Sequence, residues 1–159
     1  MQVEYINPFI ESVCSVFSTM LNSEAKRCEV GLVRSASSPR DVTALIGLSG
    51  RVRGTVALCL PVSTALAMVN GLLGTDTRVV DDTVADGVAE LVNMIAGGAK
   101  TKFSGDGTPI DLSLPTVVHG ASYAVEYPSG TRWLDVSFTS SLGPFSLRVA
   151  FEKTCTPTT

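Results

Sequence analysis

Apolar residues recur at helical spacing twice in this chain, over residues 9–20 and again over residues 84–99, and about three strand-like segments follow each stretch. Laying Glu11 on Glu90 brings the two apolar stripes into register. The matched positions are Phe9 with Val88, Val13 with Val92, Val16 with Ile95 and Met20 with Ala99. This correspondence indicates a duplicated unit of one helix and three strands. Helices grouped around antiparallel strands predict an α+β fold, in which the long helices of pseudo-repeated units pack on an antiparallel sheet.

Local signals set the bounds of the predicted elements. Caps, prolines and glycines mark where the helices begin and end, and alternating apolar residues mark the strands. The predicted helices are a first helix that Asn7 caps and Pro8 opens, a second from Pro61 to Leu73 that Gly74 ends, and a third from Asp81 or Asp82 to about Lys102. The predicted strands are Cys28–Arg34, Val42–Ser49, Val52–Leu60, Thr116–Tyr127, and two segments around 134–138 and 145–151, with a tight turn at Ser49-Gly50.

Length and charge narrow the class of protein. The 159 residues predict a single domain over 1–159, with a loose tail from about residue 154. A net charge of -3, with scattered basic residues, argues against a nucleic acid or a membrane surface as the partner. The first 22 residues lack a basic n-region, and the most apolar stretch, Thr55–Val69, is too short to span a bilayer. We therefore expect a soluble, cytoplasmic protein.

Cysteine and histidine are too sparse for the usual metal or nucleophile sites. The four cysteines, at positions 14, 28, 59 and 155, include no CxxC pair, and His119 is the one histidine. A Cys/His metal site therefore lacks ligands, and a catalytic triad would have to use His119, which lies in a predicted strand. No phosphate-binding loop of the GxxxxGK[ST] type is present. We expect this chain to bind no metal and no cofactor.

The third predicted helix has one polar side. Its apolar stripe, which must face the core, comprises Val84, Val88, Leu91, Val92, Ile95 and Ala99. Asp86, Glu90, Asn93 and Gly97 fall within a narrow arc opposite, and Met94 lies beside that arc. Glu90 and Asn93 are one turn apart and can act on one bound object. Gly97 and Gly98 each cost about 1 kcal/mol of helix propensity, which indicates that something packs closely there. The flexible thioether of Met94 suits a surface that binds another protein.

The Glu-x-x-Asn pair by itself predicts a docking face and not an enzyme. This spacing arises by chance on the solvated side of many helices. The pair also does not provide the matched acid and base that most hydrolases use. The surrounding sequence is therefore needed to interpret it.

Several segments resemble the CheC/CheX/FliY phosphatase family. The stretch Asp86–Gly98 is similar to the signature helix of that family, and Ile6–Val13 resembles the start of its CheX-type members. Further similarity lies at Ile46–Gly50, with Gly54, and at Leu114–Val118. Each motif is modest alone, but together they follow one order over nearly the whole chain.

The resemblance implies a phosphatase that hydrolyses the aspartyl phosphate of a CheY-like response regulator. Glu90 and Asn93 match the functional pair of the signature helix: Asn93 would orient the attacking water, and Glu90 would pair with the regulator's lysine. The regulator would bring its own Mg²⁺. Asp86, Met94 and Gly97 would contribute to docking.

The resemblance also bears on the number of sites and on assembly. Some members of the family carry the signature on both repeat helices, but here Cys14 stands where a second Asn would be. A thiol cannot present the carbonyl and amide that hold a water, so we expect one active site per chain. The resemblance to CheX-type members implies that two copies of this chain form a homodimer through their sheets.

Two alternatives come from other functional classes. The first is a non-catalytic module that binds a regulator in a chemotaxis or flagellar switch system. The second is a protein that modulates receptor-modifying enzymes, as CheC-type members do. Release of phosphate from a phosphorylated receiver separates the first alternative from the phosphatase.

Overall fold

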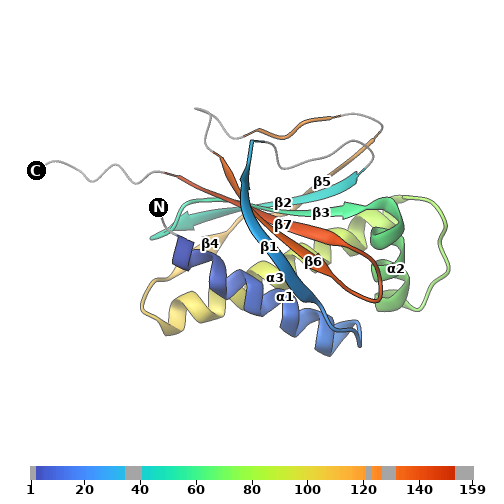
Figure 1. Cartoon of the computed structure of the whole chain (residues 1–159), viewed down its shortest axis with the longest axis horizontal. Coiled ribbons are helices and arrows are strands. Elements are labelled where there is room, and N and C mark those ends of the chain that lie inside the picture. Colours follow the sequence, from blue (N-terminus) through green and yellow to red (C-terminus); the bar gives the residue numbers. More distant parts are fainter. Residues whose placement is uncertain (1–2, 35–40, 121–122, 127–131, 153–159) are drawn as a thin grey trace, which may run out of the picture.

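Helices and strands follow one another in two similar runs along the chain (Figure 1). The computed structural model describes residues 3–34, 41–120, 123–126 and 132–152. The helical elements are η1 (Val3–Ile6), α1 (Asn7–Met20), α2 (Val62–Leu73) and α3 (Asp82–Gly105). The strands are β1 (Lys26–Val33), β2 (Asp41–Gly50), β3 (Gly54–Pro61), β4 (Ile110–Leu112), β5 (Thr116–His119), β6 (Trp133–Thr139) and β7 (Phe145–Phe151).

The strands described form one antiparallel sheet whose order reflects the repeat. The order is β1-β6-β7-β3-β2-β4, and β5 also pairs with β2. The first unit supplies β1, β2 and β3, and the second supplies β5, β6 and β7. If β1, β2 and β3 are exchanged with β5, β6 and β7 respectively, the order β1-β6-β7-β3-β2-β5 becomes β5-β2-β3-β7-β6-β1. This is the same order read backwards, as expected for two equivalent units. The predicted duplication of a helix with three strands is confirmed in this topology, as is the α+β fold.

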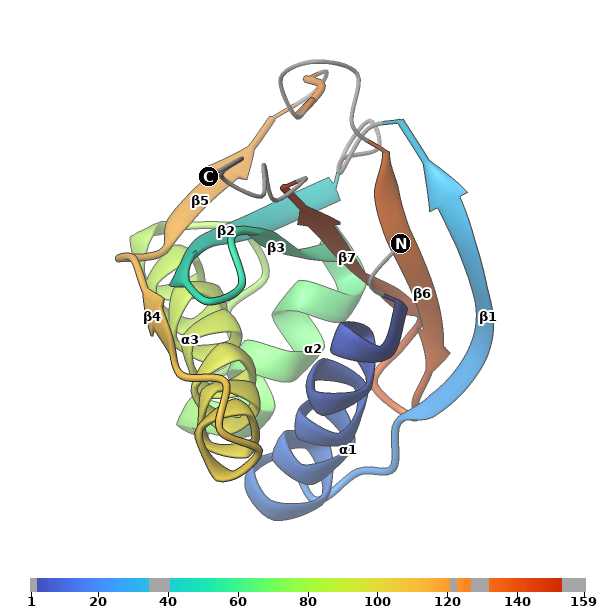
Figure 2. The same cartoon turned by 90° about the vertical axis from the view of Figure 1, so that its left-hand side faces the viewer.

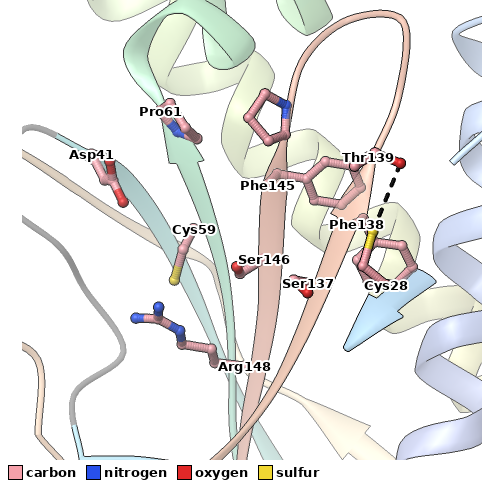
Figure 3. A pocket seen from close by; sticks show the side chains of 11 residues that line it. Cys28, Asp41, Cys59, Pro61, Ser137, Phe138, Thr139, Phe145, Ser146 and Arg148 are labelled. Carbon is pink, nitrogen blue, oxygen red and sulfur yellow. Dashed lines mark hydrogen bonds between the residues drawn. The ribbon is translucent and has the colours of Figure 1, made fainter. Parts of the chain in front are cut away.

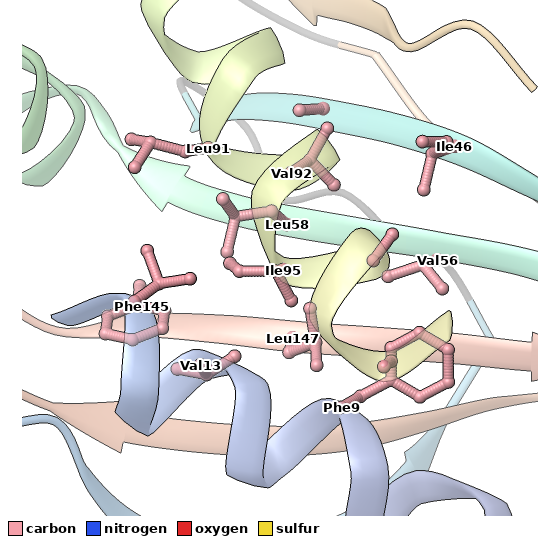
Figure 4. Packing of buried hydrophobic residues seen from close by; sticks show 14 of the residues in the cluster. Phe9, Val13, Ile46, Val56, Leu58, Leu91, Val92, Ile95, Phe145 and Leu147 are labelled. Atoms are coloured by element: carbon pink, nitrogen blue, oxygen red, sulfur yellow. The ribbon is translucent and has the colours of Figure 1, made fainter. Parts of the chain in front are cut away.

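All three α-helices cover the same face of the sheet (Figure 2). The core lies between them and the sheet. Figure 4 shows its centre, where Phe9 and Val13 of α1 and Leu91 and Ile95 of α3 meet Leu58 and Leu147 of the strands. Each of these six side chains is fully buried. The predicted apolar stripe of the third helix is thus the side that seals the core.

Glycines let the helices approach one another closely. A Cβ at Gly87 of α3 would lie 2.7 Å from Cγ1 of Val69 on α2. A Cβ at Gly98 would collide with the hydroxyl of Ser12 on α1, which donates a hydrogen bond of 2.6 Å to the carbonyl of Ile95. The close packing predicted at Gly97-Gly98 therefore belongs to Gly98 alone, because nothing lies within 4 Å of a Cβ at Gly97.

The first helix differs from its prediction at both ends. Asn7 is its first residue and not its cap, because η1 leads directly into the helix and no side chain caps the start. Met20, predicted on the core stripe, is 48% exposed because α1 ends there, whereas α3 continues beyond the matching Ala99.

The turn after β2 is also displaced. Ser49 and Gly50 do not form a tight turn, since they remain in β2 and pair with Asp111 and Ile110 of β4. The hairpin instead closes through residues 51–53, and β3 begins at Gly54. The short β4 was not predicted, because only its pairing with β2 makes it a strand.

The strand predicted at Thr116–Tyr127 is shorter than expected. Only Thr116–His119 belong to β5, and Tyr123 instead places its hydroxyl 2.6 Å from the carbonyl oxygen of Asp41, to which it donates. Residues 121, 122 and 127 lie outside the described part, as does the tail predicted from residue 154. No helix among the described residues has the length and hydropathy needed to cross a membrane.

Gly87→Ala should destabilise the fold. The added methyl group meets both methyl groups of the buried Val69, which cannot both move away by a rotation of the side chain. Such overpacking costs about 1–3 kcal/mol of unfolding free energy. The midpoint and slope of urea denaturation measure the change.

Gly71→Ala provides the matched control for that measurement. Gly71 lies in α2, and nothing lies within 4 Å of the position that a Cβ would take there. The variant should therefore be neutral or gain up to about 1 kcal/mol of helix propensity. Equal stability of the Gly87 and Gly71 variants would contradict the close approach of α2 and α3.

Candidate functional site

The N-terminus of α3 is fixed by its cap. A carboxylate oxygen of Asp81 accepts a 2.9 Å hydrogen bond from the backbone N–H of Val84, which confirms one of the two predicted caps. From there, all six predicted stripe residues are fully buried; they are Val84, Val88, Leu91, Val92, Ile95 and Ala99. The rotation of α3 about its axis is therefore set, and so is the direction in which its polar side points.

The polar side of α3 faces outward. Asp86, Glu90 and Asn93 are exposed, and Gly97 is half-buried. In the described part of the chain, no hydrogen bond or ion pair engages the side chain of Glu90 or Asn93. A carboxylate and an amide one turn apart are therefore both available to a group that approaches from outside.

The residues beside this pair differ in how accessible they are to a partner protein. The open space above Gly97 leaves the helix backbone accessible between Asn93 and the C-terminal turns. Met94 is half-buried and packs against the core, so less of its thioether is exposed than the sequence indicated. The accessible surface is thus polar at its centre.

The repeat-related position on α1 is not available in the same way. Glu11, the counterpart of Glu90, forms an ion pair of 2.7 Å between its Oε2 and Nζ of Lys102. Cys14, the counterpart of Asn93, is half-buried, and its thiol points to the carbonyl of Ala25 at 3.6 Å. Burial, and secondly the nearby Glu24, raise the pKa of Cys14, so the thiol stays neutral.

Lys102 is the residue that sequence reasoning missed at this second position. Its pairing with Glu11 joins the C-terminal part of α3 to α1, and no sequence spacing reveals such a contact between helices. When the two repeats are aligned so that Glu11 matches Glu90, the residue that matches Lys102 is Ser23. Ser23 lies beyond the end of α1. The repeat therefore supplies no equivalent cation beside Glu90.

A second region with reactive residue types is a hollow of about 320 Å³ on the sheet (Figure 3). Its lining includes Cys28 of β1, Asp41 of β2, Cys59 of β3 and Arg148 of β7. Burial raises the pKa of Cys59 to about 12, so it is not a thiolate at neutral pH. Nε of Arg148 donates to a carboxylate oxygen of Asp135 at 2.7 Å, which engages this cation within the sheet. The polar side of α3 is therefore the stronger candidate for the functional site.

Metal ligands do not gather in the described part of the chain. No three His, Cys, Asp or Glu residues there are grouped closely enough to hold an ion. His119 is exposed at the end of β5, where it pairs with Val42 across the sheet.

Comparisons with known proteins agree on one family. The family model described as "Chemotaxis phosphatase CheX" matches residues 42–139, which include all of α3. Among curated proteins, the "CheY-P phosphatase CheX" of Thermotoga maritima is 27% identical over 127 residues, which are 79% of this chain and 82% of that protein.

Solved structures share the fold over nearly their whole length. A CheC-like superfamily protein from Shewanella sp. PV-4 is 32% identical with a TM-score of 0.86, over 96% of this chain and 100% of that one. CheX in the CheX-CheY-BeF3-Mg²⁺ complex from Borrelia burgdorferi is 26% identical with a TM-score of 0.81, also over 96% and 100%.

Proposed function

We propose that this chain, which belongs to the CheX family of chemotaxis phosphatases, removes the phosphoryl group from the aspartate of a CheY-like response regulator through Asn93 and Glu90. The chain is a phosphatase, in agreement with the family model and the curated relative. The Borrelia complex pairs a relative with CheY, which supports the choice of partner. Response regulators of this kind act in the cytoplasm, and we propose the same compartment for this chain.

The observation that carries the residue assignment is the freedom of the pair. Glu90 and Asn93 project from a helix whose other side is fully buried, and neither side chain is engaged by the described residues. A rigid helix can insert such side chains into a pocket on another protein without first breaking contacts of its own. Little conformational entropy of the backbone is then lost on docking.

The proposed chemistry needs positioning more than acid-base catalysis. An aspartyl phosphate is an acyl phosphate, and its hydrolysis requires a water in line with the leaving carboxylate oxygen. The amide of Asn93 holds this water, because its carbonyl accepts a hydrogen bond from the water and its NH₂ group donates one. Orientation of this kind is worth up to about 7–11 kcal/mol in favourable cases, of which a fraction suffices here.

Glu90 sets the register of docking in this proposal. Its carboxylate forms a charge-assisted contact with the lysine of the regulator's phosphorylation site. The regulator also brings the Mg²⁺ that neutralises charge on the phosphoryl oxygens, so the metal is part of the substrate. The Glu11–Lys102 pair and Cys14 support one such site per chain.

Asn93→Ala should abolish catalysis and preserve binding. Without the amide, the water is no longer held in line, and hydrolysis should fall by about 100-fold or more, close to the regulator's own rate. Stopped-flow or radiolabel assays of phosphate loss from a phosphorylated CheY measure the rate, and titration with BeF3-activated CheY measures binding. Normal turnover in this variant would contradict the proposed mechanism.

Glu90→Ala should weaken docking as well as turnover. Loss of one charge-assisted contact should reduce affinity for BeF3-activated CheY about tenfold. Glu11→Ala is the matched control, since it removes the carboxylate at the equivalent position of the other repeat. Equal effects of the two substitutions would show that general negative charge, and not the position on α3, attracts the regulator.

We further propose that two copies of the chain join through β1. This strand lies at the end of the sheet away from α3, and its edge has no partner strand among the described residues. Val30 and Leu32 of β1 are 46% and 45% exposed, which is unusual for apolar residues of a strand. Pairing of this edge with a second copy would continue the sheet and place side chains of that copy beside both residues.

The double variant Val30→Lys, Leu32→Lys should be monomeric. Charged side chains on an edge strand oppose pairing with another chain. Light scattering coupled to size-exclusion chromatography measures the mass, with Val79→Lys as the control for added charge at an exposed apolar position. A dimer that persists in the β1 variant would refute this interface. Phosphatase activity should persist in either case.

A further inference from the structure

The segment between β4 and β5 presents an apolar side chain to solvent. Leu114 is 88% exposed, the largest exposed fraction among the large apolar residues that the structure describes. It belongs to the Leu114–Val118 stretch singled out in the sequence, to which the proposed chemistry gives no role. Burying a leucine is worth about 1.5–3 kcal/mol, so a partner that covers it gains appreciable affinity.

The backbone that carries Leu114 is firmly held. The N–H of Ser113 donates to the carbonyl of Gly47 at 3.0 Å, and the N–H of Gly47 donates to the hydroxyl of Ser113 at 2.7 Å. The same hydroxyl donates to the carbonyl of Leu114 at 3.0 Å. Pro115 follows and restricts the backbone of Leu114 further. The backbone from which the exposed side chain projects is therefore held by β2.

The position of Leu114 along α3 follows from the chain path. The chain leaves the C-terminal end of α3 and runs back beside it through β4 and β5 (Figure 2). Nζ of Lys100 lies 3.9 Å from a carboxylate oxygen of Asp111, which fixes the level of β4 against the helix. Seven helical residues back from Lys100 to Asn93 cover about 10 Å. The three residues from Asp111 to Leu114 can reach about the same length.

Asn93 also lies on the side of the polar arc nearest to this segment. Residues seven apart on a helix fall on nearly the same line, so Asn93 shares the line of Lys100, which faces β4. Gly87 and Gly98, which face α2 and α1, mark the other side of the helix. Asn93 and the segment that carries Leu114 therefore lie toward the same side of α3.

We propose that Leu114 is an apolar anchor for the same response regulator, which it contacts beside the phosphorylation pocket while Asn93 and Glu90 enter that pocket. This inference rests on the proposed function. The occupant is an apolar side chain on the rim of the receiver's active site. A buried apolar contact next to a small number of polar ones is the usual composition of an interface centre.

Leu114→Ser should weaken docking and leave the chemical step intact. We expect the dissociation constant for BeF3- and Mg²⁺-activated CheY, and the KM for phosphorylated CheY, to rise about 5- to 30-fold with kcat within twofold of the parent chain. Leu114→Met should restore most of the affinity, because it restores apolar volume. Val79→Ser is the control, because Val79 is also an exposed apolar residue, with 66% of its surface accessible. It precedes α3, and the first residue of that helix is about 16 Å along the helix from Asn93.

The outcomes separate this inference from the proposed function. A normal KM in Leu114→Ser, together with an inactive Asn93→Ala, would overturn the anchor alone. Full activity of Asn93→Ala would overturn the proposed mechanism whatever Leu114 does. The anchor would also be overturned if Val79→Ser had an equal effect, or if Leu114→Ser lowered kcat at unchanged KM. A changed molecular mass of Leu114→Ser would overturn it too, because Leu114 would then belong to a contact between copies.

Discussion

The complete burial of one side of α3 is the constraint on which the candidate site depends. Its stripe residues are all fully buried against the sheet and the other helices, so α3 can neither rotate nor shift without opening the core. Side chains on the opposite side of such a helix must point away from the core. Glu90 and Asn93 are thus presented by the stability of the fold itself, with no loop that must first be ordered.

A site of two side chains is sufficient only if the partner supplies the rest. In the proposed mechanism, the phosphoryl group, the metal and the lysine all belong to the regulator, and this chain adds a water-holding amide and a register-setting carboxylate. This division of roles asks for no metal ligand and no nucleophile from this chain. It also makes docking geometry, to which Leu114 would contribute, as important to turnover as the amide.

The sequence predicted what periodicity and local signals encode. The α3 stripe, the Asp81 cap and the outward direction of Glu90 and Asn93 followed from helical spacing, because one helix obeys one period. The turn at Ser49-Gly50 was predicted wrongly and the strand β4 was missed, because pairing with another part of the chain decides both. The Glu11–Lys102 ion pair escaped for the same reason, since it joins two helices that only the fold brings together.

The duplication separates the structural task of the repeat helices from their chemical task. Val13 and Val16 of α1 are buried like their counterparts Val92 and Ile95 of α3, so both copies retain the stripe that builds the core. The polar side of a helix contributes little to that core and is free to change. On α1 this side carries a thiol and a carboxylate paired with Lys102, whereas on α3 both side chains are unengaged by the described residues. The two helices can therefore share the same packing while their polar sides carry different residues.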